Sequence, residues 1–442
     1  MIVLDEEKII RDMQDFIRCK TVSNRKDEFV DWNEYKKLHS LMVERFPVLH
    51  SVSEQQHIGR TGLLYKIEGT GKNDSPCKTA VLMAHYDVVP VEESQWEKPP
   101  FDAVIENNVM WGRGTLDTKG TFCSILESVE VELKNGWRPQ SDLYLSFSGE
   151  EEIDGKSCPD IVSYLESKGV YPDFVLDEGG AIVEKAFPGV TSRTAMIGTA
   201  EKGSVNIDCT IEYTGGHSSS PKKHTAAGIA AMGINAIEKM PFKTQITRPL
   251  SEMLKTLVPS KKTFFELLFR FFGRNLGAEV NALTHSTIAI TKMEGSKAYN
   301  VIPNKVSFGM NVRLLGNDTI ESLFQNLKKA VRKIEKKYKV DFKFLLVNGS
   351  NPSKVSVTDC PQFKNLCDVI RKTWQEVIPT PYLMIACSDS RHYCKISDGV
   401  YRFAPMFLSK EERGLIHGNN ERIRIPELIG TTRFYCNLLE TF

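Results

Sequence analysis

The chain has 442 residues, 41% of them hydrophobic, and its 57 Lys and Arg against 56 Asp and Glu leave a net charge of +1. Balanced charge without a basic block argues against a nucleic-acid partner, and the lack of any stretch of about 20 apolar residues argues against a membrane partner. A chain of this length exceeds the size at which one hydrophobic core keeps growing, so we expect two domains.

The N-terminal segment and the cysteines both predict a cytoplasmic protein. Residues 1–20 are charged every few positions and lack the apolar core and cleavage site of a signal peptide. The ten cysteines are irregularly spaced without a CxxC, which is typical of reduced, mostly buried thiols.

The first third of the chain reads as an α/β arrangement. Apolar residues at helical spacing predict a helix over residues 5–18, and a second helix is expected around residues 33–45. Short apolar runs then predict strands, and the stretch between Thr118 and Leu133 predicts a helix that stops before Asn135. The strand runs are residues 63–69, 79–87, 102–112 and 141–149.

From about Gly198 the pattern changes to that of a second domain. Strands, helices and strands follow in the order β-α-β-β-α-β, which is typical of a ferredoxin-like unit. The segments are residues 204–215, 224–240, 286–295, 304–316, 320–339 and 341–349. We therefore expect a discontinuous first domain, residues 1–197 plus 351–442, and a second domain over residues 198–350.

An insertion at about residues 243–285 interrupts the second domain. Its segment TFFELLFRFFGRNL is apolar nearly all round, and such a helix is normally buried. We expect it to pack against its own domain or a dimer partner. A wall for an apolar substrate and contact with a membrane surface are weaker alternatives, because the basic face that membrane contact needs is thin.

The last segment is expected to return to the first domain. It predicts a helix at residues 361–377, short strands near residues 382 and 400, and a final helix after Pro426. His417 lies here, and a histidine that serves as a metal ligand must return to the first domain's crevice.

Acidic and imidazole side chains cluster where short apolar runs end. In an open α/β sheet, ligands gather outside the carboxyl ends of parallel strands, so these side chains could converge on one crevice. One carboxylate that bridges two zinc ions, with one His and one further carboxylate on each, would use five of them and leave a Glu for proton transfer. Each pair alone is more often an ordinary polar loop. The set is His85 and Asp87, Asp117, the run Glu150 to Glu152, Asp177, and His417.

Seven ordered motifs strengthen this interpretation. The segments MAHYDVVPV, GRGTLDTKG, GEEEIDG, LDEGG, TGGHSSSP, NVIPN and GLIHGNNERI resemble those of the co-catalytic zinc peptidases that include aminoacylase, carboxypeptidase S and succinyl-diaminopimelate desuccinylase. The resemblance extends from about residue 60 to residue 425. It implies a zinc-binding α/β catalytic domain interrupted by a smaller lid domain that usually mediates dimerisation.

The same resemblance implies a role for each motif residue. One zinc would be held by His85, Asp117 and Asp177, and the other by Asp117, Glu152 and His417. Glu151 would be the general base that takes a proton from the metal-bridging water and later protonates the leaving amine. Asp87 would orient His85, and the spacing to Gly155 favours Glu151 and Glu152 over Glu150 as the functional pair.

Four further residues match substrate-side positions, and one matches a position across the dimer. His217 would stabilise the oxyanion in the partner's site, although on its own it reads as a solvated loop histidine. Asn300 and Arg313 would hold the substrate carbonyl and carboxylate, since an Arg fork binds both carboxylate oxygens. Ser388 and Arg391, with Asp389 between them, fall in a substrate-side loop that a solvated turn explains nearly as well.

The sequence thus predicts a zinc-dependent hydrolase that cleaves an amide or peptide bond next to a free carboxylate. Its substrate would be a small peptide or an N-acyl amino acid, its cofactors two zinc ions with cobalt or manganese possible, and its state a homodimer formed by the second domain. A di- or tripeptidase or a desuccinylase would share every ligand. A non-catalytic binding protein on this fold is the alternative from another class, although no ligand position is substituted.

Overall fold

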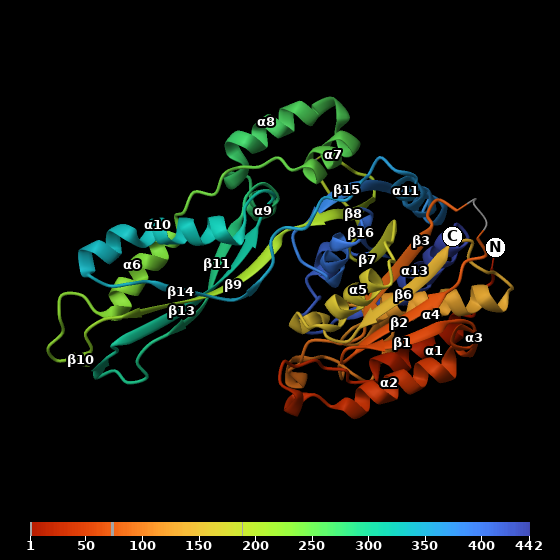
Figure 1. The fold of residues 1–442 in the computed structure, drawn as a ribbon, viewed down its shortest axis with the longest axis horizontal. Coiled ribbons are helices and arrows are strands. Elements are labelled where there is room, and N and C mark those ends of the chain that lie inside the picture. Colours follow the sequence, from red (N-terminus) through yellow and green to blue (C-terminus); the bar gives the residue numbers. More distant parts are fainter. Residues whose placement is uncertain (1, 72–74, 188) are drawn as a thin grey trace. The chain divides into compact units, whose positions relative to one another are not determined.

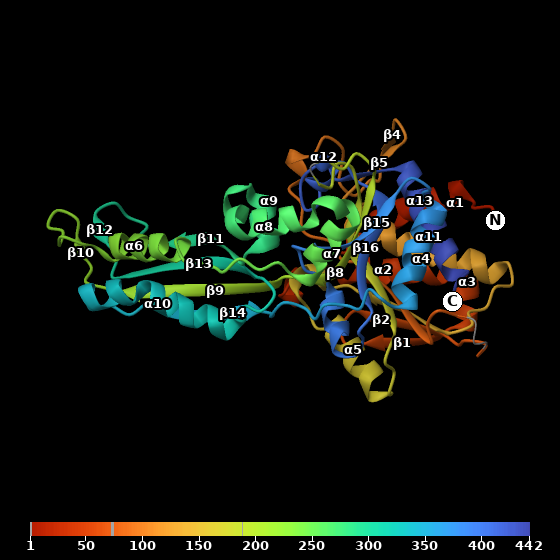
Figure 2. The same cartoon turned by 90° about the horizontal axis from the view of Figure 1, so that it is seen from above.

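A computed structural model describes residues 2–71, 75–187 and 189–442. The chain forms two compact units (Figures 1 and 2). The larger comprises Met1–Thr199, Lys354–Met384 and Ser388–Phe442, and the smaller comprises Ala200–Ser353 and Ile385–Cys387. The three residues 385–387 had been expected in the first domain. A segment of three residues is too short to show a change in composition, so the sequence gives no indication that these residues belong to the smaller unit.

The larger unit is built on an eight-stranded sheet in the order β1-β2-β6-β3-β7-β16-β8-β15. Its middle is parallel: β3 pairs with β6 and β7, and β7 pairs with β16, whereas β1, β2 and β8 pair antiparallel. The strands are β1 (Glu54–Ile58), β2 (Gly62–Ile67), β3 (Thr79–His85), β6 (Asp142–Ser148), β7 (Phe174–Val183), β8 (Thr194–Glu201), β15 (Ile378–Met384) and β16 (Val400–Phe407). A separate three-stranded sheet has the order β17-β5-β4. Its strands are β4 (Ile105–Glu106), β5 (Val109–Trp111) and β17 (Arg422–Arg424).

Helices cover both faces of this sheet. On one face Phe122 packs against Phe147 of β6, with ring centroids 4.9 Å apart, and on the other Ile161 joins a core with Val81 and Tyr144. Burial on both faces explains why the central strands are nearly continuous apolar runs. The helices are α1 (Glu6–Ile17), α2 (Trp32–Arg45), α3 (Pro47–Val52), α4 (Lys119–Lys134), α5 (Ser157–Ser167), α11 (Pro361–Thr373), α12 (Lys410–Arg413) and α13 (Ile425–Leu439), with short 3-10 turns η1 (Asp27–Phe29), η2 (Glu93–Gln95), η3 (Glu151–Ile153) and η6 (Asp389–Lys395).

The smaller unit contains a four-stranded antiparallel sheet in the order β11-β13-β9-β14. Helices α6 and α10 share one core cluster with its strands. The chain order and sheet order together are those of a split βαβ unit, the arrangement that the period changes predicted. The elements are β9 (Gly203–Glu212), α6 (Ala226–Glu238), β11 (Thr287–Glu294), β13 (Lys305–Leu314), α10 (Ile320–Tyr338) and β14 (Lys343–Gly349), with a separate ladder of β10 (Gly216–His217) and β12 (Val301–Ile302).

The insertion forms α7 (Arg248–Leu257), α8 (Lys262–Phe272) and α9 (Ala278–Thr284), with short turns η4 (Pro259–Lys261) and η5 (Gly273–Asn275). On α8 Phe269 is buried, whereas Phe264 and Phe271 are exposed. Packing against its own domain therefore does not account for these exposed side chains, and packing against a dimer partner stays a prediction. A helix with Phe on both sides gives no sequence signal for which side faces outward. Among the described residues, no helix is long and apolar enough to cross a membrane.

Candidate functional site

Three neighbouring parallel strands of the larger unit deliver polar side chains to one edge of the sheet. His85 is the last residue of β3, the Glu150 to Glu152 run follows the end of β6, and β7 carries Asp177. Because β3, β6 and β7 run parallel, their carboxyl ends meet at the same edge.

Asp117 lies between two histidines from opposite ends of the chain. Its Oδ1 is 2.9 Å from His85 Nε2, and its Oδ2 is 3.0 Å from His417 Nε2. Glu152 Oε2 lies 3.0 Å from the same His417 nitrogen. One carboxylate thus presents one oxygen to each imidazole, which is the arrangement that a bridging ligand needs.

A second group of donors centres on His85, Glu151 and Glu178, whose ligand atoms all lie within 4.8 Å of one another. Glu178 Oε1 is 3.3 Å from His85 Nε2, and this residue had not been singled out from the sequence. Its neighbour Asp177, the predicted ligand, instead accepts a hydrogen bond from Ser390 N–H at 3.0 Å. Asp177 lines the same pocket as His85 and Glu151, but the carboxylate of β7 that contacts the His85 ring is that of Glu178.

Asp87 is fully buried and holds two parts of the site together. Its carboxylate accepts hydrogen bonds from the backbone N–H groups of Glu151 (3.1 Å) and Glu152 (3.2 Å). Its Oδ1 also lies 3.3 Å from His85 Nδ1, while the ring's other nitrogen faces Asp117. Asp87 therefore orients both an imidazole and the turn that carries the two glutamates.

The register of the three consecutive glutamates follows from their contacts. Glu150 accepts a hydrogen bond from the Ser157 hydroxyl and forms an ion pair with Arg60 at 3.3 Å. It is thus engaged in structural contacts, and the donor groups that include an imidazole contain Glu151 and Glu152.

The electrostatics of the cluster reflect several carboxylates in one buried place. Burial raises the pKa of Glu178 to about 8, and the nearby Asp117 charge adds to the effect. Burial also raises the pKa of Glu151 well above its usual range and that of Glu152 above its ordinary value. Hydrogen bonds to Asp117 and Glu152 raise the pKa of His417 to about 10. Each carboxylate thus opposes ionisation of the others, and a cation among them would relieve that cost.

The donor set suits divalent cations. Imidazole nitrogens and carboxylate oxygens are the ligands that zinc takes in catalytic sites. Glu152 Oε1 is buried and has no hydrogen-bond partner within the described part of the chain, and leaving such an acceptor unmatched is costly. The residues present therefore fit two metal ions that share Asp117.

A buried ion pair that the sequence did not reveal ties the two metal-ligand loops together. Arg113 Nη1 donates to Glu421 Oε2 at 2.7 Å, and Arg113 Nη2 donates to the backbone oxygens of His417 (3.3 Å) and Gly418 (2.9 Å). Glu421 Oε1 accepts from the backbone N–H groups of Leu116 (2.7 Å) and Asp117 (3.2 Å). The two charges are 308 residues apart in sequence, so no local pattern could have paired them.

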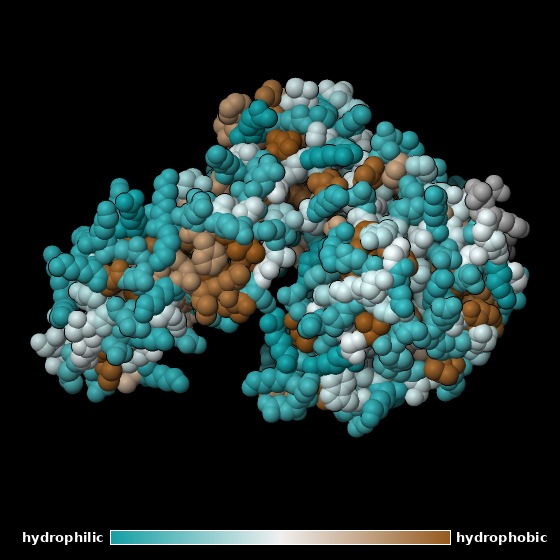
Figure 3. Space-filling view, in the orientation of Figure 1, coloured by the Kyte–Doolittle hydropathy of each residue, from teal (hydrophilic) through white to brown (hydrophobic). Residues whose placement is uncertain are grey.

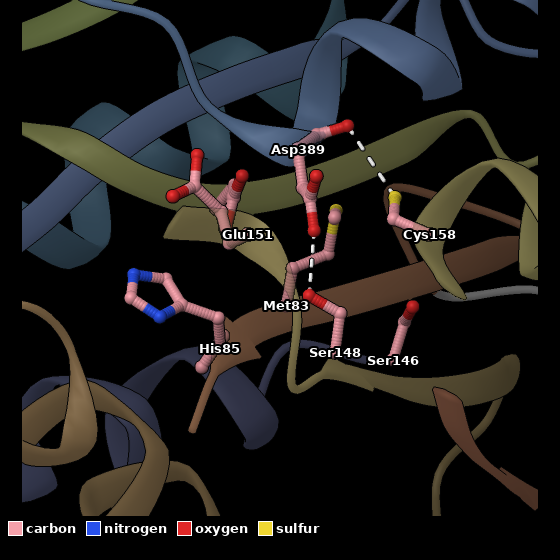
Figure 4. A pocket seen from close by; sticks show the side chains of 9 residues that line it. Met83, His85, Ser146, Ser148, Glu151, Cys158 and Asp389 are labelled. Carbon is pink, nitrogen blue, oxygen red and sulfur yellow. Dashed lines mark hydrogen bonds between the residues drawn. The ribbon is translucent and has the colours of Figure 1, made fainter. Parts of the chain in front are cut away.

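A pocket in the larger unit includes His85, Glu151 and Asp389 among its lining residues (Figure 4). Ser148 Oγ donates to Asp389 Oδ2 at 2.6 Å, and burial raises the pKa of Asp389 to about 7. Figure 4 shows the side chains of His85, Glu151 and Asp389 around the same pocket. With Asp177, which also lines it, the pocket brings an imidazole and three acids together.

The predicted substrate loop forms η6 and not a solvated turn. Ser388 is fully buried, with its hydroxyl 2.7 Å from that of Ser390. Arg391 Nη1 donates to Ser388 O at 2.9 Å, and its Nη2 pairs with Asp154. This fixes a guanidinium two residues from the pocket-lining Asp389.

The remaining predicted residues lie in the smaller unit. His217 pairs with Val301 in the β10–β12 ladder, and the N–H of the next residue, Ser218, donates to Asn300 O at 3.0 Å, so His217 and Asn300 lie close together. His217 is exposed and its Nδ1 is 2.7 Å from Ser219 Oγ. Arg313 of β13 donates to Cys387 Sγ at 3.2 Å. The roles assigned to these residues stay predictions.

Comparisons with known proteins give one matching family and several named relatives. Residues 81–441 match Peptidase family M20/M25/M40. The chain is 31% identical to probable carboxypeptidase S-like 2 of Dictyostelium discoideum, over 95% of this chain and 82% of that protein. It is also 31% identical to the N-fatty-acyl-amino acid synthase/hydrolase PM20D1 of Xenopus tropicalis, over 99% of this chain and 86% of that protein. The crystal structure of the M20 family metallo-carboxypeptidase Sso-CP2 from Sulfolobus solfataricus shares the fold, with a TM-score of 0.73, 19% identity and 99% coverage of both chains.

Proposed function

Because the chain belongs to Peptidase family M20/M25/M40 and is a hydrolase of the carboxypeptidase and aminoacylase type, we propose that it cleaves an amide bond next to a free carboxylate. The family resemblance, the α/β fold class and the hydrolase activity predicted from the sequence are thereby confirmed. The names of the relatives support two substrate classes, peptides with a free C-terminus and N-acyl amino acids.

Two zinc ions per chain would be held by six ligand atoms from five side chains, one of which, the Asp117 carboxylate, is shared. His85, Glu178 and Asp117 form the first set, and Asp117, Glu152 and His417 form the second. The observation that carries this proposal is that the two oxygens of Asp117 face His85 and His417 at 2.9 and 3.0 Å. Glu178 takes the place first assigned to Asp177, because it is the carboxylate of β7 that lies 3.3 Å from His85.

Bound zinc would polarise the scissile carbonyl and make the attacking water more acidic. Glu151 is the proton carrier: its carboxylate takes a proton from the water as the water oxygen bonds to the carbonyl carbon. It then delivers that proton to the departing nitrogen as the C–N bond breaks, so the products are a carboxylate and an amine. Its raised pKa, caused first by burial, suits a group that must both accept and release a proton.

Arg391 is a second cation that we assign to the substrate's free carboxylate, in addition to Arg313, for which the sequence predicted the same role. Its guanidinium is held by Asp154 and by Ser388 O, and a pre-oriented fork binds a carboxylate at low entropic cost. Arg391→Lys should raise KM for substrates with a free carboxylate and leave the small activity on their amidated analogues unchanged.

A homodimer is proposed through the outer edge of β14. This strand pairs with β9 on one side, and in the described chain no strand pairs with its other side. Its residues Leu345 and Val347 are exposed, and an apolar open edge is prone to pair with another strand. Leu345→Lys should shift the mass measured by light scattering from dimer to monomer.

Two measurements test the proposed function. The zinc-loaded protein should release products from pooled dipeptides or from pooled N-acyl amino acids, as detected by mass spectrometry. Absence of product from both pools would favour the non-catalytic alternative. Metal analysis then tests the ligand set: Glu178→Gln should lose close to one zinc per chain, whereas the matched variant Asp177→Asn should keep both. The reverse result would restore Asp177 as the ligand.

A further inference from the structure

Helix α8 presents large apolar side chains to the solvent on one face. Phe264, Leu267 and Phe271 recur at helical spacing and are 61%, 50% and 72% exposed, and Phe272 beside them is 54% exposed. We call these four residues the α8 face. Taking ~200 Å² for a large side chain, they expose on the order of 450 Å² of apolar surface, which is near the upper end for one patch on a soluble monomer.

The opposite side of α8 is anchored, so the α8 face belongs to a folded helix. Phe269 is buried, and its ring lies 6.1 Å from that of Phe265. Ser251 of α7 donates to Glu266 at 2.6 Å, and Glu266 also pairs with Lys262. The helix is therefore pinned along one side, and its aromatic residues on the other side are held outward.

The exposed charged residues of α8 and its flanking turns are cations, and the one acid of the helix, Glu266, is paired with Lys262. Lys261, Arg270 and Arg274 are exposed and lie at or beyond its margins. The insertion, residues 243–285, contains seven Lys and Arg against three Glu, and two of those glutamates are already paired, Glu252 with Arg248 and Glu266 with Lys262. The insertion thus concentrates positive charge that the whole chain, at +1, does not show.

We propose that the α8 face is a docking surface for a lipid bilayer that contains anionic phospholipids. The phenyl and leucyl side chains enter the boundary between headgroups and acyl chains, and the flanking cations bind the lipid phosphates. A protein partner would bury the aromatics equally well, but a rim that carries cations alone complements an anionic surface. In Figure 3, brown and tan atoms lie among teal and white ones over the α8 segment at the top of the view.

This differs from the expectation of no membrane partner. That expectation used the absence of a long apolar stretch, which does not detect a short helix that lies on a surface. Membrane-surface contact by this segment was the weaker alternative because its basic face is thin, and the exposed Lys261, Arg270 and Arg274 now argue for it. The proposal rests on the α8 face alone and not on the proposed hydrolase activity, since binding to vesicles needs no catalysis.

Co-sedimentation of the full chain with vesicles tests it. Binding to mixed phosphatidylcholine and phosphatidylserine vesicles should exceed binding to phosphatidylcholine alone by at least ~10-fold and should weaken with salt. Phe264→Ser with Phe271→Ser should remove most binding to both. The matched control is Phe29→Ser, because Phe29 is 63% exposed but belongs to the larger unit, and this variant should bind as the wild type does.

A charge-reversed variant separates the two contributions. Lys261→Glu with Arg270→Glu leaves the aromatic residues in place and should abolish the preference for anionic vesicles. Failure of the wild type to sediment would overturn the proposal, as would equal binding by the Phe264 and Phe271 double variant. A fall in oligomer mass in that double variant, without vesicle binding by the wild type, would instead identify a second copy of the chain as the occupant.

Discussion

Replacing Glu421 by Gln should weaken both metal-ligand loops at once. The substitution keeps the shape of the side chain but leaves the buried Arg113 guanidinium without its counter-ion, and it places an amide N–H₂ where backbone N–H groups now donate. Removing one partner of a buried ion pair costs about 3–5 kcal/mol. Glu421 also accepts a hydrogen bond from the Asp117 N–H, and Arg113 donates one to the His417 carbonyl. Part of the lost stabilisation should therefore appear as weaker positioning of these two metal ligands.

The expected result is a zinc affinity lowered by roughly 10–100-fold, the usual effect of losing a group that orients a metal ligand. A chromophoric chelator competing for zinc measures it directly, alongside thermal unfolding of the metal-free and zinc-loaded forms. Arg113→Lys keeps the charge but loses the fork to His417 and Gly418, so its effect should be smaller and in the same direction.

The matched control is Glu411→Gln, which removes a carboxylate from an exposed pair with Arg422. It should change neither stability nor zinc affinity measurably, since exposed pairs contribute little. If Glu421→Gln unfolds at the wild-type temperature and binds zinc as tightly, the ion pair does not position the loops and the reasoning fails.

Other predictions follow from single contacts. Asp117→Ala should lose more zinc than His85→Ala, because Asp117 faces both imidazoles and His85 reaches only one ion, and equal metal content would argue against a shared ligand. Burial, with a contribution from a nearby imidazole, lowers the pKa of His39 to about 4. Below about pH 6.5 the unfolded chain binds a proton at this residue and the folded chain does not, so the free energy of unfolding falls as the pH falls towards 4. His39→Gln should reduce this loss, as measured by unfolding scans at several pH values. Mixed dimers of His217→Ala and Glu151→Gln should recover activity approaching a quarter of wild type if His217 serves the partner's site, and no recovery despite proven subunit exchange would place it in cis.

The sequence predicted those parts of the fold that depend on local pattern. Strand ends are visible as apolar runs that stop at a polar residue, so the sequence alone places His85 and the Glu150 to Glu152 run at one sheet edge. The alternation of strands and helices likewise located the smaller unit to within a few residues of its observed limits, 200 and 353.

The sequence could not decide which way individual side chains point from their strand or helix. Asp177 and Glu178 are adjacent carboxylates in one strand, and which of them faces His85 depends on the strand's rotation in the sheet, which the continuous apolar run before them does not encode. The same limit applies to α8, where aromatic residues on both sides hid the outward face. The pair of Arg113 and Glu421 was hidden for another reason, because its two members meet only after the chain has closed.

The central claim is that Glu151 carries the proton in a site whose metals are held by other residues. Glu151→Gln, prepared with zinc, tests it when metal content and kcat are measured on the same sample. The expected result is two zinc ions per chain, as in the wild type, with kcat lowered by at least ~100-fold. Loss of zinc from this variant, or activity that persists in Glu151→Gln but disappears in Glu150→Gln, would contradict the account.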